Sequence, residues 1–152
     1  MNSYRAQESE VIYAPPEQVY AIIADYHEGH PAILPSRYFT DMVVTAGGQG
    51  EGTVITVAMN VFGAKILYEM SVSEPEPGRI LVEEDKSAGV VTSFTIDPVN
   101  GGDRSRVTIA TEAKTAPGFR GFLEEIINPI IIRRIYRQEL SQLATVVKEK
   151  YG

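Results

Sequence analysis

The chain contains no cysteine and no tryptophan, and only two of its 152 residues are histidine. The missing cysteines exclude disulfides, thiol nucleophiles and thiolate metal sites. The longest apolar run, 126–132, is broken by Asn128 and Pro129 and is too short to span a bilayer. The first residues lack the apolar core of a secretory signal. We therefore expect a cytoplasmic protein without stable membrane insertion.

Basic residues are also scarce, with 14 Lys and Arg against 20 Asp and Glu, which gives a net charge of -6. Proteins that bind nucleic acids depend on a basic surplus to neutralise phosphates, so this balance argues against nucleic acid as a partner. Hydrophobic residues make up 43% of the chain and charged residues 22%, which is typical of a globular protein. The length suits one domain with one core, and we expect residues 1–152 to form it.

Short turn-forming segments rich in Gly, Pro and Asn divide the middle of the chain into strand-length pieces. In 64–73, Ile66, Tyr68, Met70 and Val72 alternate with mostly polar residues, as in a strand with one buried face. Short connections join antiparallel neighbours, so the pieces form a meander. Including one strand before the first helix, the predicted strands are 4–13, 37–46, 52–60, 64–73, 79–85, 90–97 and 104–113.

Helical periodicity marks two other segments. Val19, Ile22, Ile23 and Tyr26 lie at i, i+3, i+4 and i+7 after a Pro15-Pro16 pair that suits a first helical turn. Residues 27–36 form a loop or a second short helical turn. A much longer stripe runs from about residue 117 to 150 and predicts a helix of about 50 Å.

The order of elements predicts an α+β fold, β-α(α)-β6-α, in which a seven-stranded antiparallel sheet wraps around the long C-terminal helix. A sheet with one apolar face needs a cover, and only this helix is large enough. The segment 12–26, with Ala14-Pro15 and Ala24-Asp25-Tyr26, and the turn 50–53 carry a resemblance to a known family. The chain resembles the START-like, helix-grip superfamily, also called SRPBCC, in its bacterial polyketide cyclase/dehydrase-like branch. It departs from that pattern at 27–31, where many members have a tryptophan-rich loop.

The resemblance implies a cavity between the sheet and the C-terminal helix, which holds a lipid-, sterol- or polyketide-like molecule. The expected function is therefore the binding, transport or sensing of a small apolar ligand. Tyrosine hydroxyls and threonines can orient a ligand oxygen, and methionines adapt to irregular shapes. The predicted ligand-binding residues are Tyr20, Tyr26, Tyr38, Ile55, Val57, Met59, Tyr68, Met70, Thr92, Phe94, Phe122, Ile126 and Ile130.

The two histidines, His27 and His30, give little support for a metal site. Their His-x-x-His spacing differs from the i, i+4 pair that places two rings on one helix face, and Gly29 and Pro31 oppose a regular helix. We expect no metal and no cofactor. His30 is the one side chain considered as a general acid or base, because the pKa of a free histidine lies near neutrality.

Two alternatives to a carrier remain open. The first is a cyclase or dehydratase that acts on a polyketide-like substrate, which needs acid and base groups aimed into the cavity. Few ionisable residues fall on the apolar strand faces, and 83–85 is interpreted as an exposed hairpin tip, so the sequence favours binding over catalysis. The second is an interaction module with a filled core, in which Ile132, off the main stripe, makes a homodimer contact.

Overall fold

The computed structural model describes residues 2–152, except for the side chains of Phe119, Phe122, Leu123 and Ile126. Seven strands form one antiparallel sheet in the order β1-β7-β6-β5-β4-β3-β2. This arrangement confirms the predicted fold class. The elements are β1 Ser3–Ile12, α1 Pro16–Ala24, α2 Gly29–Ile33, β2 Phe39–Ala46, β3 Val54–Val61, β4 Ala64–Glu76, β5 Ile80–Asp85, β6 Val90–Val99, β7 Arg104–Lys114 and α3 Gly118–Tyr151, with a short 3-10 turn at Asn100–Gly102.

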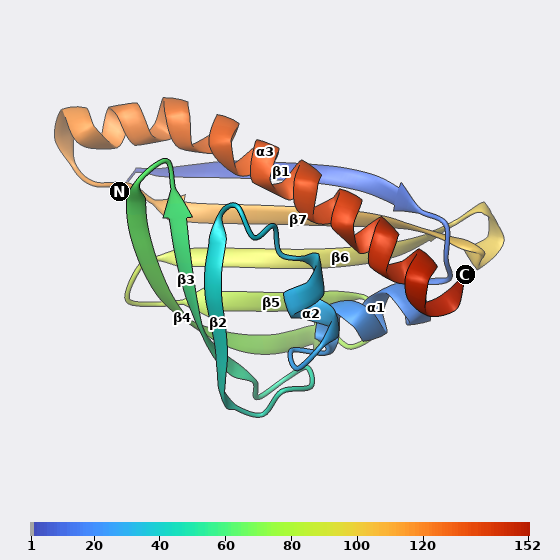
Figure 1. Cartoon of the computed structure of the whole chain (residues 1–152). Helices are drawn as coiled ribbons and strands as arrows, with labels where there is room; N and C mark the ends of the chain where they lie inside the picture. The colour runs from blue at the N-terminus through green and yellow to red at the C-terminus, as the bar shows by residue number, and fades with distance from the viewer. Residues whose placement is uncertain (1) are drawn as a thin grey trace.

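The C-terminal helix covers the curved face of the sheet. In Figure 1, α3 runs diagonally across the sheet, and α1 and α2 lie beside its C-terminal half. The Gln142 side chain of α3 donates a hydrogen bond to the Ala32 carbonyl of α2, at 3.3 Å. Buried apolar residues from α1, the sheet and α3, such as Ile23, Ile109 and Leu140, form one core. Each such side chain stabilises the fold by about 1.5–3 kcal/mol through burial.

The α1–α2 turn is held by Asp25. Its carboxylate accepts hydrogen bonds from the backbone N–H groups of His27, Glu28 and Gly29. Burial opposes ionisation of Asp25, but these hydrogen bonds outweigh it and lower its pKa below the ordinary 3.8. The Asp25 carbonyl also accepts a hydrogen bond from the backbone N–H of His30, at 2.7 Å. The turn therefore fixes the start of α2 and the position of His30 over the sheet.

The hairpin between β3 and β4 turns at Phe62 and Gly63, which both have positive φ angles, 50° and 90°. A two-residue turn of this handedness matches the twist of the flanking strands. The Phe62 side chain is 62% exposed. The hairpin consequently presents an aromatic ring at the open end of the space between the sheet and α3.

Candidate functional site

A cavity of about 380 Å³ lies between the sheet and α3. Most of its wall is apolar and comes from β2, β3, β4, β6 and α3. Its exposed lining residues, Phe62 and Ala64, mark the end that reaches solvent. The volume is at the lower end of the range for pockets that hold small organic ligands.

Seven of the thirteen predicted ligand-binding residues line this cavity, and they come from β3, β4 and β6: Ile55, Val57, Met59, Tyr68, Met70, Thr92 and Phe94. Alternation along each strand brings them to one face, as the sequence indicates. Burial raises the pKa of Tyr68 to about 12, so its hydroxyl is neutral and available as a donor to a ligand.

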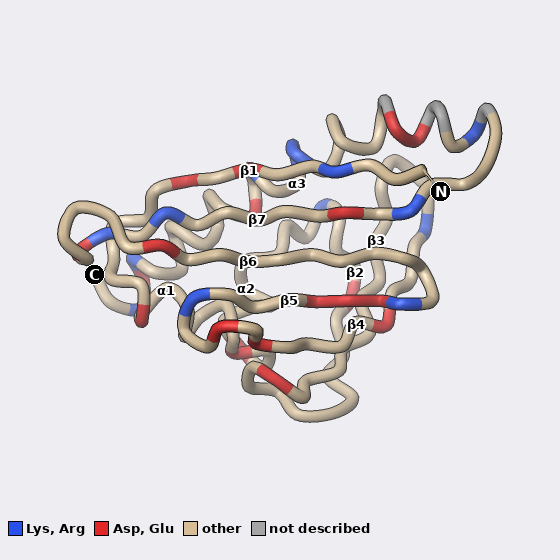
Figure 2. The backbone as a smooth tube through the Cα atoms, turned by 180° about the vertical axis from the view of Figure 1, so that it is seen from behind, with Lys and Arg blue, Asp and Glu red and all other residues tan. Residues whose placement is uncertain are grey.

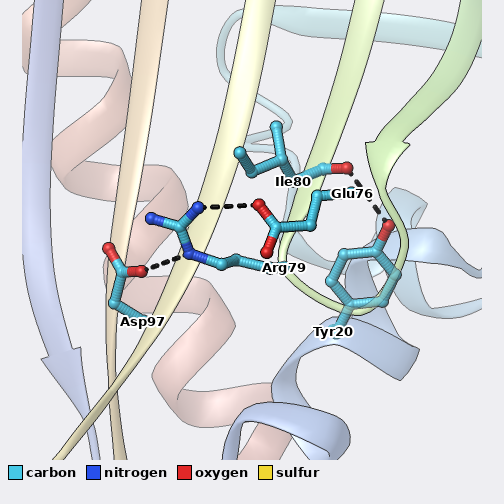
Figure 3. A network of polar contacts seen from close by, with 5 residues as sticks. All are labelled: Tyr20, Glu76, Arg79, Ile80 and Asp97. Atoms are coloured by element: carbon cyan, nitrogen blue, oxygen red, sulfur yellow. Dashed lines mark hydrogen bonds and ion pairs between the residues drawn. The ribbon is translucent and has the colours of Figure 1, made fainter.

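Three predicted tyrosines lie elsewhere. Tyr20 belongs to α1, and its side chain points to the region where β4 ends and β5 begins. Its hydroxyl donates to Glu74 at 2.6 Å and reaches the Ile80 carbonyl at 3.5 Å. Figure 3 shows it pointing to Ile80, beside the ion pairs that Arg79 makes with Glu76 and Asp97. Tyr26 does not line the cavity, but its hydroxyl bonds to Glu83, which does.

Tyr38 packs edge-on against the Phe62 ring, with 6.2 Å between centroids, and its buried hydroxyl has no hydrogen-bond partner among the described residues. On α3, Ile130 is 57% exposed. The predictions for Phe122 and Ile126 concern side chains outside the described part of the structure. Ile132 lines the cavity, so its position does not support a homodimer contact.

A polar cluster closes the buried end of the cavity, and it contains residues that the sequence analysis missed. His30, Glu83, Thr92 and Glu139 all line the cavity and are all at least 92% buried. Glu83 was interpreted as part of an exposed tip, and that interpretation is wrong. Residues 80–85 form β5, and Leu81, Glu83 and Asp85 alternate onto its buried face. Figure 2 shows the acidic run as a red stretch along β5.

His30 and Glu83 form the centre of the cluster. The Nδ1 of His30 lies 2.7 Å from the Ile23 carbonyl, and Nε2 lies 3.4 Å from Oε2 of Glu83. A carbonyl only accepts, so Nδ1 carries a proton and Nε2 faces the carboxyl. His30 and Glu83 are therefore a buried pair of polar groups, 3.4 Å apart at the cavity wall.

Aromatic rings hold this pair in place. The Tyr26 hydroxyl donates to Oε2 of Glu83 at 2.6 Å, and the Tyr26 ring stacks on the His30 ring with 4.4 Å between centroids. Phe94 packs edge-on against the other side of His30, at 5.3 Å. Burial and the Glu83 charge raise the pKa of Tyr26, so its hydroxyl stays a donor. Tyr26 thus acts on the site through Glu83 and His30.

Three further hydroxyl groups form a hydrogen-bonded chain that includes Thr92 of the cluster. Tyr136 of α3 bonds to Thr111 of β7, and Thr111 bonds to Thr92 of β6 at 2.7 Å. Burial raises the pKa of Tyr136, and its hydrogen bond with Thr111 opposes that rise. These hydroxyls satisfy one another within the protein.

Glu139 of α3 differs from its neighbours. It is only 2% exposed and faces the cavity. Burial and the charge of Glu83 raise its pKa well above the ordinary 4.5, and no hydrogen bond in the described part of the chain opposes this. The raised pKa favours the neutral acid form of this carboxyl, which lies at the closed end of an apolar cavity.

Neither a metal ligand set nor a membrane span was found in the described residues. No group of three or more His, Asp or Glu side chains there is arranged to hold a metal ion. No helix in residues 2–152 is both long enough and apolar enough to cross a membrane. His27, the second histidine of the sequence, is exposed at the α1–α2 turn beside Gly48.

The sheet wrapped around α3, with a cavity between them, is a helix-grip fold. Residues 4–148 match the family model described as polyketide cyclase / dehydrase and lipid transport. The chain belongs to this family. No curated protein matches the sequence significantly.

Solved structures are similar to this chain over almost its whole length. The solution structure of the KanY protein (ms6282) is 30% identical with a TM-score of 0.83, and the match covers 97% of this chain and 99% of that one. The Zhui aromatase/cyclase from Streptomyces sp. R1128 is 13% identical with a TM-score of 0.78, covering 99% and 97%. A START superfamily protein from Mycobacterium smegmatis is 14% identical with a TM-score of 0.65, covering 97% and 96%. The last two share the fold alone with this chain.

Proposed function

We propose that the protein binds a small, largely apolar molecule that carries one polar group, in the cavity between the sheet and α3. The cavity itself is the observation that supports this function: about 380 Å³ with apolar walls, open at Phe62 and closed by polar side chains. Burial of apolar surface contributes about 25 cal/mol per Å², which can hold such a ligand without an ion pair. Transport or sensing of the molecule would each use this binding step.

The test uses the uncharged fluorescent dye N-phenyl-1-naphthylamine and two variants on one strand. Met70 lines the cavity, whereas Leu67 points away from it and is 69% exposed. Met70→Ala removes roughly 1 kcal/mol of ligand contact and is expected to weaken dye binding about fivefold. Leu67→Ala is expected to leave dye affinity unchanged, as measured by fluorescence titration.

Both variants must retain the wild-type circular dichroism spectrum at the titration temperature. Equal dye affinity in folded Met70→Ala and Leu67→Ala proteins would place the dye outside the cavity and contradict the proposal. Weak binding in both would point to a general loss of stability, which the spectrum reveals.

A second candidate function is acid–base catalysis on a bound carbonyl compound. The observation that favours it is the His30–Glu83 pair at the cavity wall, together with the Glu139 carboxyl, whose pKa is raised by burial. An acid that polarises a carbonyl beside a base that removes a neighbouring proton is a recognised catalytic arrangement. Such chemistry would suit a cyclase or dehydratase.

The catalytic alternative is tested by proton exchange. A ketone such as 2-decanone is incubated with the protein in D₂O, and the hydrogens next to its carbonyl are followed by NMR. A catalyst is expected to speed their loss, and His30→Gln is expected to abolish the gain. If the wild-type rate equals that of buffer, binding without proton abstraction stands.

A further inference from the structure

Glu139 belongs to the buried stripe of α3, between apolar residues. Ile135, Tyr136 and Leu143 lie about one helical turn from it on the same face, and all are buried. A glutamic acid at such a position destabilises a core unless its carboxyl has a partner. The position therefore requires an explanation.

The neighbouring polar groups of the cluster do not supply that partner. Tyr26 donates to Glu83, and His30 donates to the Ile23 carbonyl. Tyr136 is engaged with Thr111. Among the described residues, the Glu139 carboxyl is thus the member of the cluster that lacks a hydrogen bond within the protein.

The charges around the cavity limit what can bind Glu139. The described lining residues include Glu83, Glu139 and His30 but no lysine or arginine. A ligand carboxylate would lie beside the Glu83 and Glu139 carboxyls, with no lysine or arginine among the described lining residues to pair with it. Buried like charges repel strongly where water is excluded. The closed end of the cavity is consequently hostile to anions.

A neutral carboxylic acid has one O–H donor, and its complement is an uncharged acceptor. We propose that the ligand carries a carbonyl oxygen, as in a ketone, aldehyde, ester or amide, that accepts a hydrogen bond from Glu139, and that this same end rejects carboxylates. This inference rests on the proposed function and adds the chemical class of the ligand. Glu139 is then the residue that selects the polar group, while the apolar wall holds the rest.

The test compares three probes with chains of similar length: 2-decanone below its solubility limit, and decanoate and decylamine below their critical micelle concentrations. Displacement of N-phenyl-1-naphthylamine at pH 7.5 measures their affinities. The ketone is expected to bind at least about tenfold more tightly than decanoate. Calorimetric enthalpies for the ketone in phosphate and Tris are expected to agree, because a neutral acceptor leaves Glu139 protonated.

Two substitutions test whether Glu139 acts as a hydrogen-bond donor to the ligand or only fills space in the cavity wall. Glu139→Gln keeps an N–H donor of similar size and is expected to hold ketone affinity within about threefold of wild type. Glu139→Leu keeps the volume without a donor and is expected to lower ketone affinity about tenfold, which corresponds to one hydrogen bond. Glu84→Gln, on the opposite face of β5, is the matched control and is expected to change no affinity.

The outcomes distinguish this inference from the function on which it rests. Equal affinities for the ketone and decanoate, or an unchanged ketone affinity in Glu139→Leu, would overturn the inference while a binding cavity remains. Tightest binding of decylamine, with proton release, would show an ionised Glu139 that pairs with a cation, which also overturns it. Failure of the dye and of all three probes to bind would overturn the proposed function itself.

Discussion

Glu139→Leu is expected to make the unliganded protein more stable than wild type at pH 7.5, by about 1–3 kcal/mol. The substitution removes a buried polar group without a protein partner, and the desolvation penalty of such a group is of that size. The same change is expected to weaken ligand binding, as is common where a site is built at the expense of the core. Urea denaturation gives both free energies of unfolding.

The gain should depend on pH, because the pKa of Glu139 is raised in the folded state. Above its ordinary pKa of 4.5, the unfolded chain releases this proton while the folded protein keeps it. The stability that the protonated Glu139 contributes is therefore complete below pH 4.5 and is lost as pH rises towards the folded pKa. Over that window the Leu variant gains on wild type by about 1.4 kcal/mol per pH unit.

A matched variant isolates this titration. His30, Glu83, Tyr26 and Tyr136 also face the cluster, and all four are present in each of the proteins compared. Glu139→Gln has no ionisable group, so its stability relative to Glu139→Leu is expected to be independent of pH. A constant difference between wild type and Glu139→Leu from pH 5 to 8 would show that Glu139 titrates normally.

The fold could be predicted from the sequence because its signals are local and repeated. Alternation placed Ile55, Val57 and Met70 on one sheet face, and the periodic stripe marked α3. The strand boundaries agreed within two residues, apart from β4, which continues three residues further, to Glu76, through an irregular pairing near Ser73. Because these patterns repeat along the chain, one irregular position does not change the predicted fold.

The site was harder to predict because it depends on the direction of single side chains. An acidic triplet before a Lys-Ser-Ala-Gly turn favours an exposed tip by composition, yet its alternation continues that of Leu81 and carries Glu83 inward. On α3, isoleucines occupy so many consecutive positions that the period cannot choose between the exposed Ile130 and the cavity-lining Ile131. Only the packed helix decides which of them contacts a ligand.

His30→Leu is expected to lower the free energy of unfolding by about 3–5 kcal/mol at pH 7. The substitution leaves Glu83 buried without its imidazole partner, and it also removes the ring stacked on Tyr26. Breaking one partner of a buried pair has a cost of this size, because the other charge stays in a site without water. Chemical denaturation of both proteins measures it.

The double variant His30→Leu, Glu83→Leu tests whether the cost comes from the stranded carboxyl. Replacing both members of a buried pair with apolar residues is often nearly neutral, since no charge is left behind. We expect the double variant to be about 2 kcal/mol or more above His30→Leu in stability, a coupling that a double-mutant cycle measures directly. If the losses of the single variants His30→Leu and Glu83→Leu simply add in the double variant, His30 and Glu83 do not stabilise one another, and the cluster must be held by Tyr26 and the helix packing alone.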